Sequence, residues 1–150
     1  MLFSKELSVG NRVIDSEHKN LHGIIDGIAG LIEARDIVTL HEAFELLENR
    51  LHTYFAVEET VAQAVNFDFT QHRLAHQHLL NEFRRIKHGL MAKNGLWTKL
   101  EKAGHINSMR KCLIRHITED GKPLKVVLGT YLYDFKPGCA DDNAVLHGVG

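Results

Sequence analysis

The first 122 residues of this chain contain no proline, since its two prolines are Pro123 and Pro137. Proline ends or kinks a helix, so long helices are permitted over most of the sequence. In the same region apolar residues recur at spacings of three, four and seven, which is the pattern of one helical face. Four such apolar seams consist of Ile14, Leu21, Ile25, Ile28 and Ile32; Phe44, Leu47, Leu51, Val61 and Val65; Leu79, Phe83, Ile86 and Leu90; and Ile106, Met109 and Leu113. The sequence therefore predicts helices, and nothing in the pattern indicates strands.

The seams predict helices over residues 16–35, 40–65 and 70–92, and a fourth helix that begins with Ile106. The pair Asn94-Gly95 is typical of the end of a helix. The residues expected to cap the helix starts are Asp15 or Ser16, then Thr39 with Glu42 in a capping box, then Asp68 or Thr70. The connections between the predicted helices are mostly short.

The end of the fourth helix carries a break signal. Gly121 and Pro123 predict a distortion soon after position 120, and the apolar run 124–128 predicts a short further helix. Amphipathic helices with short connections indicate an all-α fold, an antiparallel four-helix up-down bundle over residues 1–128. Residues 129–150 are predicted to be a C-terminal tail, because they contain Gly and Asp without helical periodicity and from Phe135 onward look loosely held.

Charge and cysteine usage narrow the possible partners and location. A formal net charge of -1 does not favour nucleic acid or an anionic membrane surface as a partner. No window approaches the roughly 18 apolar residues of a membrane span, and the N-terminus lacks the pattern of a signal peptide, so we expect a cytoplasmic protein. Cys112 and Cys139 are too few for a disulfide scaffold and lack the spacing of a zinc or redox motif, so both are expected to be reduced thiols.

Histidine is unusually frequent, with 11 residues in the chain. A polar group at an inward position must find a partner or destabilise the fold. Extending the apolar seams places seven side chains that can bind metal inside the bundle, all at the same end: His18, Tyr54, Glu58, His72, His76, His116 and Asp120. Imidazole and carboxylate ligands together suit iron, manganese or zinc, and this number of ligands indicates two ions with bridging carboxylates.

The remaining histidines are expected to have other roles. His22 follows His18 by one helical turn and is expected at the edge of the seam, either beside a metal ligand or as an ordinary interface residue. His105 shares the inward face of the fourth helix with His116 but lies about three turns away. The histidines predicted at the surface are His41, His52, His78, His88 and His147.

Four segments resemble a known family. They are VGNRVIDSEHKNL around His18, YFAVEE at 54–59, His72-Arg-Leu-Ala-His76, and CLIRHITED at 112–120. In this order and at this spacing they resemble the hemerythrins, in particular the single-domain bacterial hemerythrins, over roughly residues 2–128. The resemblance implies two non-haem iron ions joined by an oxo or hydroxo bridge. It implies the following ligands: His72, His76 and His116 on one iron, Glu58 and Asp120 as bridges, and His18 on the second iron, where the family binds dioxygen.

The sequence departs from the family pattern at Tyr54, which stands where the second iron should have another histidine. His52 is two residues away, about 200° round the helix from Tyr54, so it cannot reach the same ion from a regular helix. We therefore expect Tyr54 to be the ligand. The alternative is that Tyr54 fills the same gap and makes a hydrogen bond to a bridging carboxylate without touching iron.

Two further departures lie near His116. The oxygen carriers place an aspartate five residues after this histidine, where this chain has Gly121, whereas Asp120 follows at four and stays on the same helical face. Glu119 is the second candidate for the bridge. Cys112 stands where the family usually has tryptophan, which changes the packing beside His116 without adding a ligand.

Tyr54 also changes the expected function. A phenolate is a hard anionic donor that prefers Fe(III), so oxygen bound at such a site should give way readily to a diferric state. We expect a binding protein, not an enzyme, that binds, senses or stores O2 or reacts with a related oxidant such as peroxide or nitric oxide. The alternatives are a di-iron oxidase, peroxidase or nitric oxide reductase served by an electron donor, and an adaptor whose tail 129–150 recruits a partner. The oligomeric state stays open.

Overall fold

The computed structural model of the chain describes residues 7–138, and the regular structure among these residues is helical, with no strand. The prediction of an all-α fold is confirmed. The elements are the α-helices Arg12–Ala34 (α1), Ile37–Ala64 (α2), Thr70–Ala92 (α3), Lys99–Arg115 (α4) and Lys122–Leu128 (α5), and the π-helical segment His116–Asp120 (η2) between α4 and α5.

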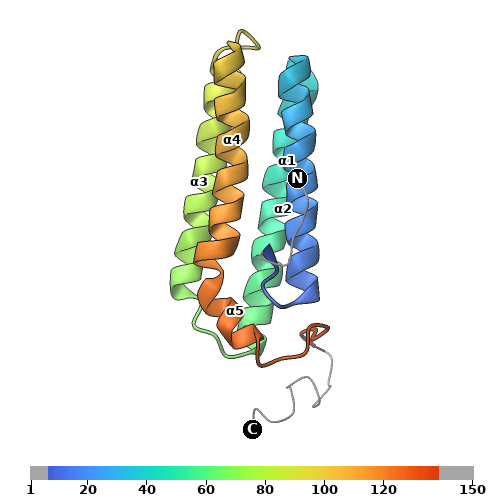
Figure 1. Cartoon of the computed structure of the whole chain (residues 1–150), viewed down its shortest axis with the longest axis vertical. Helices are drawn as coiled ribbons and strands as arrows, with labels where there is room; N and C mark the ends of the chain where they lie inside the picture. Colours follow the sequence, from blue (N-terminus) through green and yellow to red (C-terminus); the bar gives the residue numbers. More distant parts are fainter. Residues whose placement is uncertain (1–6, 139–150) are drawn as a thin grey trace.

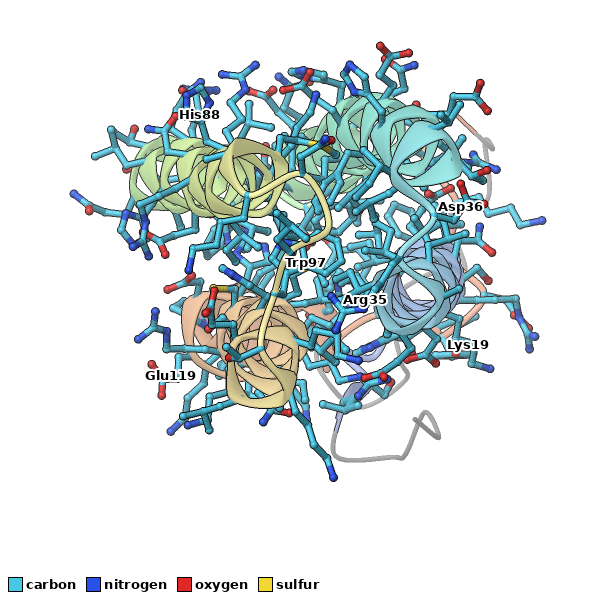
Figure 2. The ribbon with its side chains drawn as sticks, turned by 90° about the horizontal axis from the view of Figure 1, so that it is seen from above. Lys19, Arg35, Asp36, His88, Trp97 and Glu119 are labelled. Atoms are coloured by element: carbon cyan, nitrogen blue, oxygen red, sulfur yellow. The ribbon has the colours of Figure 1, made fainter. Side chains whose placement is uncertain are left out.

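The four long helices lie side by side along the long axis of the molecule (Figure 1). The α1–α2 and α3–α4 connections lie at one end, and the α2–α3 connection lies at the other end with η2 and α5 (Figure 1). Seen along this axis, side chains of all four helices fill the space between them (Figure 2). The predicted apolar seams form this core, since all of their residues are buried.

The start of α1 differs from the prediction. Asn11, not Asp15 or Ser16, caps this helix, because its Oδ1 accepts hydrogen bonds from the amides of Val13 and Ile14, each at 3.1 Å. The apolar seam begins only at Ile14, so it gives no signal for the polar first turn of the helix. The helix therefore begins at Arg12 and not near position 16.

The starts of α2 and α3 lie within a few residues of the predicted positions; the cap of α2 differs from the prediction, whereas Asp68 was one of the two candidates for α3. Asp36 caps α2 by accepting a hydrogen bond from the Thr39 amide at 3.2 Å, so Thr39 lies inside the helix. Phe69 precedes α3 and makes no side-chain cap. Asp68 instead accepts from the Thr70 amide at 3.0 Å. Local polar residues compete for these positions, so the sequence pattern alone does not select among them.

The fourth helix begins at Lys99, seven residues before the predicted start at Ile106. Thr98 caps it by accepting a hydrogen bond from the Glu101 amide at 3.1 Å. Before this cap, Trp97 is buried and donates from Nε1 to the Leu90 carbonyl at 3.0 Å, which ties the connection to the end of α3 (Figure 2). The first two turns of α4 contribute no residue to the buried core, so they were not visible as an apolar seam.

The predicted distortion near position 120 is confirmed, because α4 passes into η2 there. The Gly121 amide donates to the His116 carbonyl at 2.9 Å, which is the i→i+5 bond of a π-helical turn. A Cβ atom at Gly121 would lie 2.6 Å from the Ile117 carbonyl oxygen, so the backbone packs too closely there for a side chain. The predicted short helix over 124–128 is observed as α5.

Residues 129–138, the first part of the predicted tail, return to the start of α1. The Arg12 amide donates to the Tyr133 carbonyl at 2.9 Å, and Asn11 Nδ2 donates to the Phe135 carbonyl at 3.0 Å. Tyr133 Oη donates to Asp15 Oδ2 at 3.0 Å, and Asp15 is buried. The expectation of a loose chain from Phe135 onward is therefore wrong for Phe135 itself. Residues 139–150, including Cys139 and His147, lie outside the described residues.

Candidate metal centre

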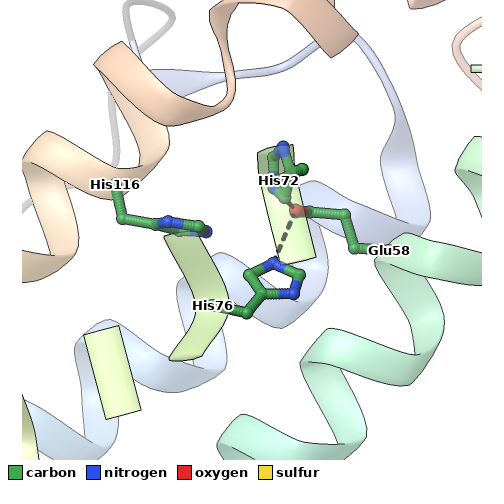
Figure 3. A group of neighbouring side chains, drawn as sticks. All are labelled: Glu58, His72, His76 and His116. Atoms are coloured by element: carbon green, nitrogen blue, oxygen red, sulfur yellow. Dashed lines mark hydrogen bonds and ion pairs between the residues drawn. The ribbon is translucent and has the colours of Figure 1, made fainter. Parts of the chain in front are cut away.

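Four buried side chains from three elements converge where α2 ends and α3 begins (Figure 3). They are Glu58 of α2, His72 and His76 of α3, and His116 of η2. Each offers one ligand atom, and these atoms all lie within 4.8 Å of one another. His72 and His76 share one helical face because they are four residues apart. Three imidazoles and a carboxylate form a donor set that can hold a metal ion.

Glu58 lies at the middle of this group. Its Oε1 accepts a hydrogen bond from His76 Nε2 at 3.0 Å and is in contact with His72 Nε2, while Oε2 lies 3.8 Å from His18 Nε2. Burial acts to raise the pKa of Glu58, but the contacts with His18, His72 and His76 outweigh burial and hold the pKa well below its usual range. The carboxylate is therefore charged and available as an anionic ligand.

His72 is the least satisfied polar residue of the group. Its Nε2 lies against Glu58 Oε1 without the geometry of a hydrogen bond, and its Nδ1 has no partner among the described residues. The ring of Phe69 stacks on this imidazole, with centroids 4.7 Å apart and an interplanar angle of 19°. A buried imidazole without hydrogen bonds is costly, and a bound metal ion would compensate it. The donor set fits a metal ion on this observation.

Tyr54 lies between two histidines from different elements. Its Oη is 3.0 Å from His18 Nε2 and 2.8 Å from His116 Nε2. Burial, and next the charge of Glu58, raise the pKa of Tyr54 well above its usual value, so the metal-free site holds a phenol. A phenol has one proton to donate, so Tyr54 donates to one histidine and accepts from the other.

Asp120 decides the direction of these two hydrogen bonds. Its Oδ2 lies 3.2 Å from His116 Nδ1, and this hydrogen bond lowers the pKa of Asp120. An ionised carboxylate only accepts, so a neutral His116 carries its proton on Nδ1 and keeps a lone pair on Nε2. Tyr54 then donates to His116 Nε2 and accepts from His18 Nε2. In this tautomer the Nε2 lone pair of His116 points into the centre, which is the form a metal ion requires.

A second group of donors adjoins the first. His18 Nε2 is within 4 Å of both Tyr54 Oη and Glu58 Oε2, at 3.0 Å and 3.8 Å. The two oxygens of Glu58 therefore face different histidines, with Oε1 toward α3 and Oε2 toward α1. This arrangement is compatible with a carboxylate shared between two ions.

The structure buries six of the seven predicted metal-binding residues, namely His18, Tyr54, Glu58, His72, His76 and His116. Asp120 differs from the prediction of an inward position, because its side chain is 42% exposed. The prediction assumed a regular α-helix, in which Asp120 would lie on the same face as His116. The wider turn of η2 changes the angle between successive residues, so Asp120 does not follow this face. Glu119, the second candidate for the bridge, is also exposed.

The other histidines mostly follow the prediction. The exposed ones are His41, His52, His78 and His88. His22 is buried, deeper than the expected seam edge, and burial followed by the charge of His18 lowers its pKa. His105 is half-buried at the far end of the bundle, where its ring faces the backbone of Gly89.

Two phenylalanines beside the centre were not predicted as part of it. Phe55 stacks on His76 with centroids 4.0 Å apart and an interplanar angle of 17°, as Phe69 does on His72. Such stacking fixes the plane of each imidazole and keeps water away from it. Phe55 directly follows Tyr54 within the motif YFAVEE, so the sequence could have indicated its place beside the centre. Phe69 lies in a connection between helices, and no sequence pattern indicates its position there.

Comparisons with known proteins found no match: no protein-family model, no curated protein and no solved structure matches the chain. Among the described helices, none is sufficiently long and apolar to cross a membrane. The geometry of the buried Glu58, His72, His76 and His116 group thus carries the functional argument.

Proposed function

We propose that this chain is a hemerythrin-like, non-haem di-iron protein that binds or reacts with O2 or a related small oxidant. The single observation that carries the proposal is the buried group of Glu58, His72, His76 and His116. We also infer that its helices form an antiparallel up-and-down bundle, which is supported by the alternation of connections between the two ends (Figure 1). In such a bundle the end of α2 lies beside the start of α3, and this arrangement brings Glu58 close to His72 and His76.

Each residue has a role in this proposal. His72, His76 and His116 would hold one ion, His18 and Tyr54 would hold the second, and Glu58 would give one oxygen to each. Asp120 is retained as the candidate second bridge, although its observed contact is with His116 Nδ1. When bound, two iron ions would supply electrons to a small oxidant and a coordination position for it.

The protein side chains prepare the site for this chemistry. Burial of His18, Tyr54 and Glu58 keeps water from the donor atoms and strengthens electrostatic interactions among them. Ligation by Tyr54 requires loss of its phenol proton, which burial opposes and an adjacent cation favours. Tyr54 would lose this proton more readily beside Fe(III) than beside Fe(II), because the charge of Fe(III) is greater. Tyr54 would therefore bias the site toward the oxidised state.

Iron analysis combined with optical spectroscopy of the oxidised protein tests the proposal. We expect two iron ions per chain and a visible charge-transfer band from tyrosinate bound to Fe(III). A protein that binds no iron after anaerobic addition of Fe(II) would contradict the proposed function.

The variant Tyr54→Phe tests the tyrosine separately. We expect it to retain iron through the histidines and Glu58 but to lose the visible band, because the phenolate oxygen is absent. Tyr131→Phe is the matched control, since Tyr131 packs on Phe135 and makes no contact with the centre. A band of unchanged intensity in Tyr54→Phe would exclude Tyr54 as a ligand.

A further inference from the structure

A cavity of about 640 Å³ adjoins the metal centre on the side of α3 and η2. The lining residues that matter for its chemistry are Asp68, Gln71, His72, Ala75, Glu119 and Asp120. They come from the α2–α3 connection, the first turns of α3 and the end of η2. Glu119 projects away from the helices at the rim, in contact with solvent (Figure 2). The cavity therefore opens at the surface.

The lining of this cavity is acidic. It includes the carboxylates of Asp68, Glu119 and Asp120 and the imidazoles of His72 and His78, and no lysine or arginine occurs among the described residues that line it. Clefts lined by charges of one sign concentrate ions of the opposite sign and accelerate their arrival. A cation is thus the chemical class that this cavity attracts.

The inner end of the cavity reaches two residues of the centre. His72 lines the cavity while only 4% exposed, and its Nδ1 has no partner among the described residues. Asp120 also lines it, and the same carboxylate that is 42% exposed contacts His116 Nδ1. Both residues therefore connect the solvent side with the buried donor group.

A second cavity of about 640 Å³ does not offer such a connection. It lies between α2 and α3, with Phe44, Leu47 and Phe83 in its lining. Its charged groups are Arg84, which pairs with Glu48 of the same lining, and Lys87. None of the four clustered ligands lines it. Its position, away from the four clustered ligands, is unsuitable for a cation that moves toward the centre.

We propose that the acidic cavity beside His72 is the route by which a divalent metal ion enters the centre. The carboxylates at the rim first attract the hydrated ion, Asp120 then binds it at the inner end, and the buried histidines with Glu58 replace its remaining water. The inference rests on the proposed metal site but concerns the path to that site and the rate of loading.

Gln71 allows a test that leaves every proposed ligand intact. It lines the cavity and is exposed, so its replacement changes the charge of the route without changing the donor set. Protein stripped by a chelator is mixed with Co(II) in a stopped-flow instrument, and the rise of the Co(II) ligand-field absorption is recorded. We expect Gln71→Glu to load about threefold faster than wild type and Gln71→Lys about threefold slower, with smaller differences at high salt.

Gln77→Lys is the matched control, because Gln77 is an exposed residue of the same helix outside the cavity lining. We expect it to load at the wild-type rate. All variants should bind the same final amount of Co(II), which shows that the centre itself is unchanged. Equal loading rates for Gln71→Glu and Gln71→Lys, with equal final amounts, would overturn the proposed route.

A steric variant gives an independent measurement. Ala75 is half-buried in the lining, so Ala75→Phe would narrow the cavity, and we expect loading to slow at every salt concentration. Unchanged loading in a folded Ala75→Phe protein would also overturn the route. A wild-type protein that binds no Co(II) or Fe(II) at all would contradict the proposed function as well, so the two failures can be distinguished.

Discussion

Glu58 is a single anionic group among buried imidazoles. Its two oxygens face histidines of α1 and α3, and its pKa is held well below the usual range by His18, His72 and His76. Removal of its charge would leave these imidazoles without the acceptor that orients them. The carboxylate therefore determines both the affinity of the site for cations and the arrangement of its histidines.

We expect Glu58→Gln to lose metal at concentrations that saturate the wild type, with at least a tenfold weaker affinity. The amide is nearly the same size as the carboxylate but carries no charge. Metal content after equilibrium dialysis is the measurement. Glu59→Gln is the matched control, because Glu59 pairs with Arg73 at the surface, and it should bind metal normally. Full metal content in Glu58→Gln would contradict the assignment.

Asp120 has two possible roles that one variant separates. In the structure its carboxylate accepts from His116 Nδ1 and fixes the tautomer of that histidine. On this basis we expect Asp120→Ala to keep both metal ions but with an affinity lowered about tenfold to a hundredfold. Loss of one full equivalent of metal in titrations would instead assign Asp120 as a bridging ligand.

At the scale of elements, η2 is the segment that adapts the bundle to the centre. The turn His116–Asp120 inserts an i→i+5 bond at the end of α4, and Gly121 passes close to the Ile117 carbonyl. Such π-helical turns are rare and occur frequently at functional sites. Here the turn carries His116 and sets the orientation of Asp120 at the inner end of the acidic cavity.

We expect Gly121→Ala to destabilise the protein by about 1–3 kcal/mol, because the new Cβ would lie 2.6 Å from the Ile117 carbonyl oxygen. Urea unfolding of the metal-free protein measures this difference. Gly104→Ala in α4 is the control, since nothing lies within 4 Å of its Cβ position, and it should be neutral or stabilising by up to about 1 kcal/mol. Equal stability of the two variants would mean that η2 tolerates a side chain.

At the scale of the whole molecule, the centre joins helices that are distant in sequence. Glu58 contributes from α2, His72 and His76 from α3, and His116 from η2. A metal ion bound by these residues would hold the elements together only in the folded state. Binding to the folded state alone stabilises it by mass action.

Metal should therefore raise the stability of the wild-type protein by about 2.7 kcal/mol at a free concentration one hundred times the Kd. Differential scanning calorimetry with added Co(II) or with a chelator measures the shift in Tm. Glu58→Gln should show a clearly smaller shift, because its affinity for metal is at least tenfold weaker. A wild-type Tm that does not respond to metal would contradict a site shared among the helices.

The fold class and most of the centre followed from helical periodicity. The regular seams placed His18, Tyr54, Glu58, His72 and His76 inside the bundle, and all five are buried. A regular helix has a fixed angular step, so one apolar face in the sequence defines which polar residues share it. Positions within regular helices could therefore be predicted without the structure.

The sequence by itself determined that the chain is helical and which residues of the regular apolar seams face inward. The tertiary structure decided the features that depend on contacts between distant segments or on irregular backbone. These include the cap at Asn11, the outward orientation of Asp120 beyond the π turn, and the attachment of Phe135 to the start of α1. The tertiary structure also brought Tyr54 within 3.0 Å of His18 and 2.8 Å of His116, and formed the acidic cavity beside His72. Local periodicity describes one helix at a time, whereas these features require several elements to be placed together.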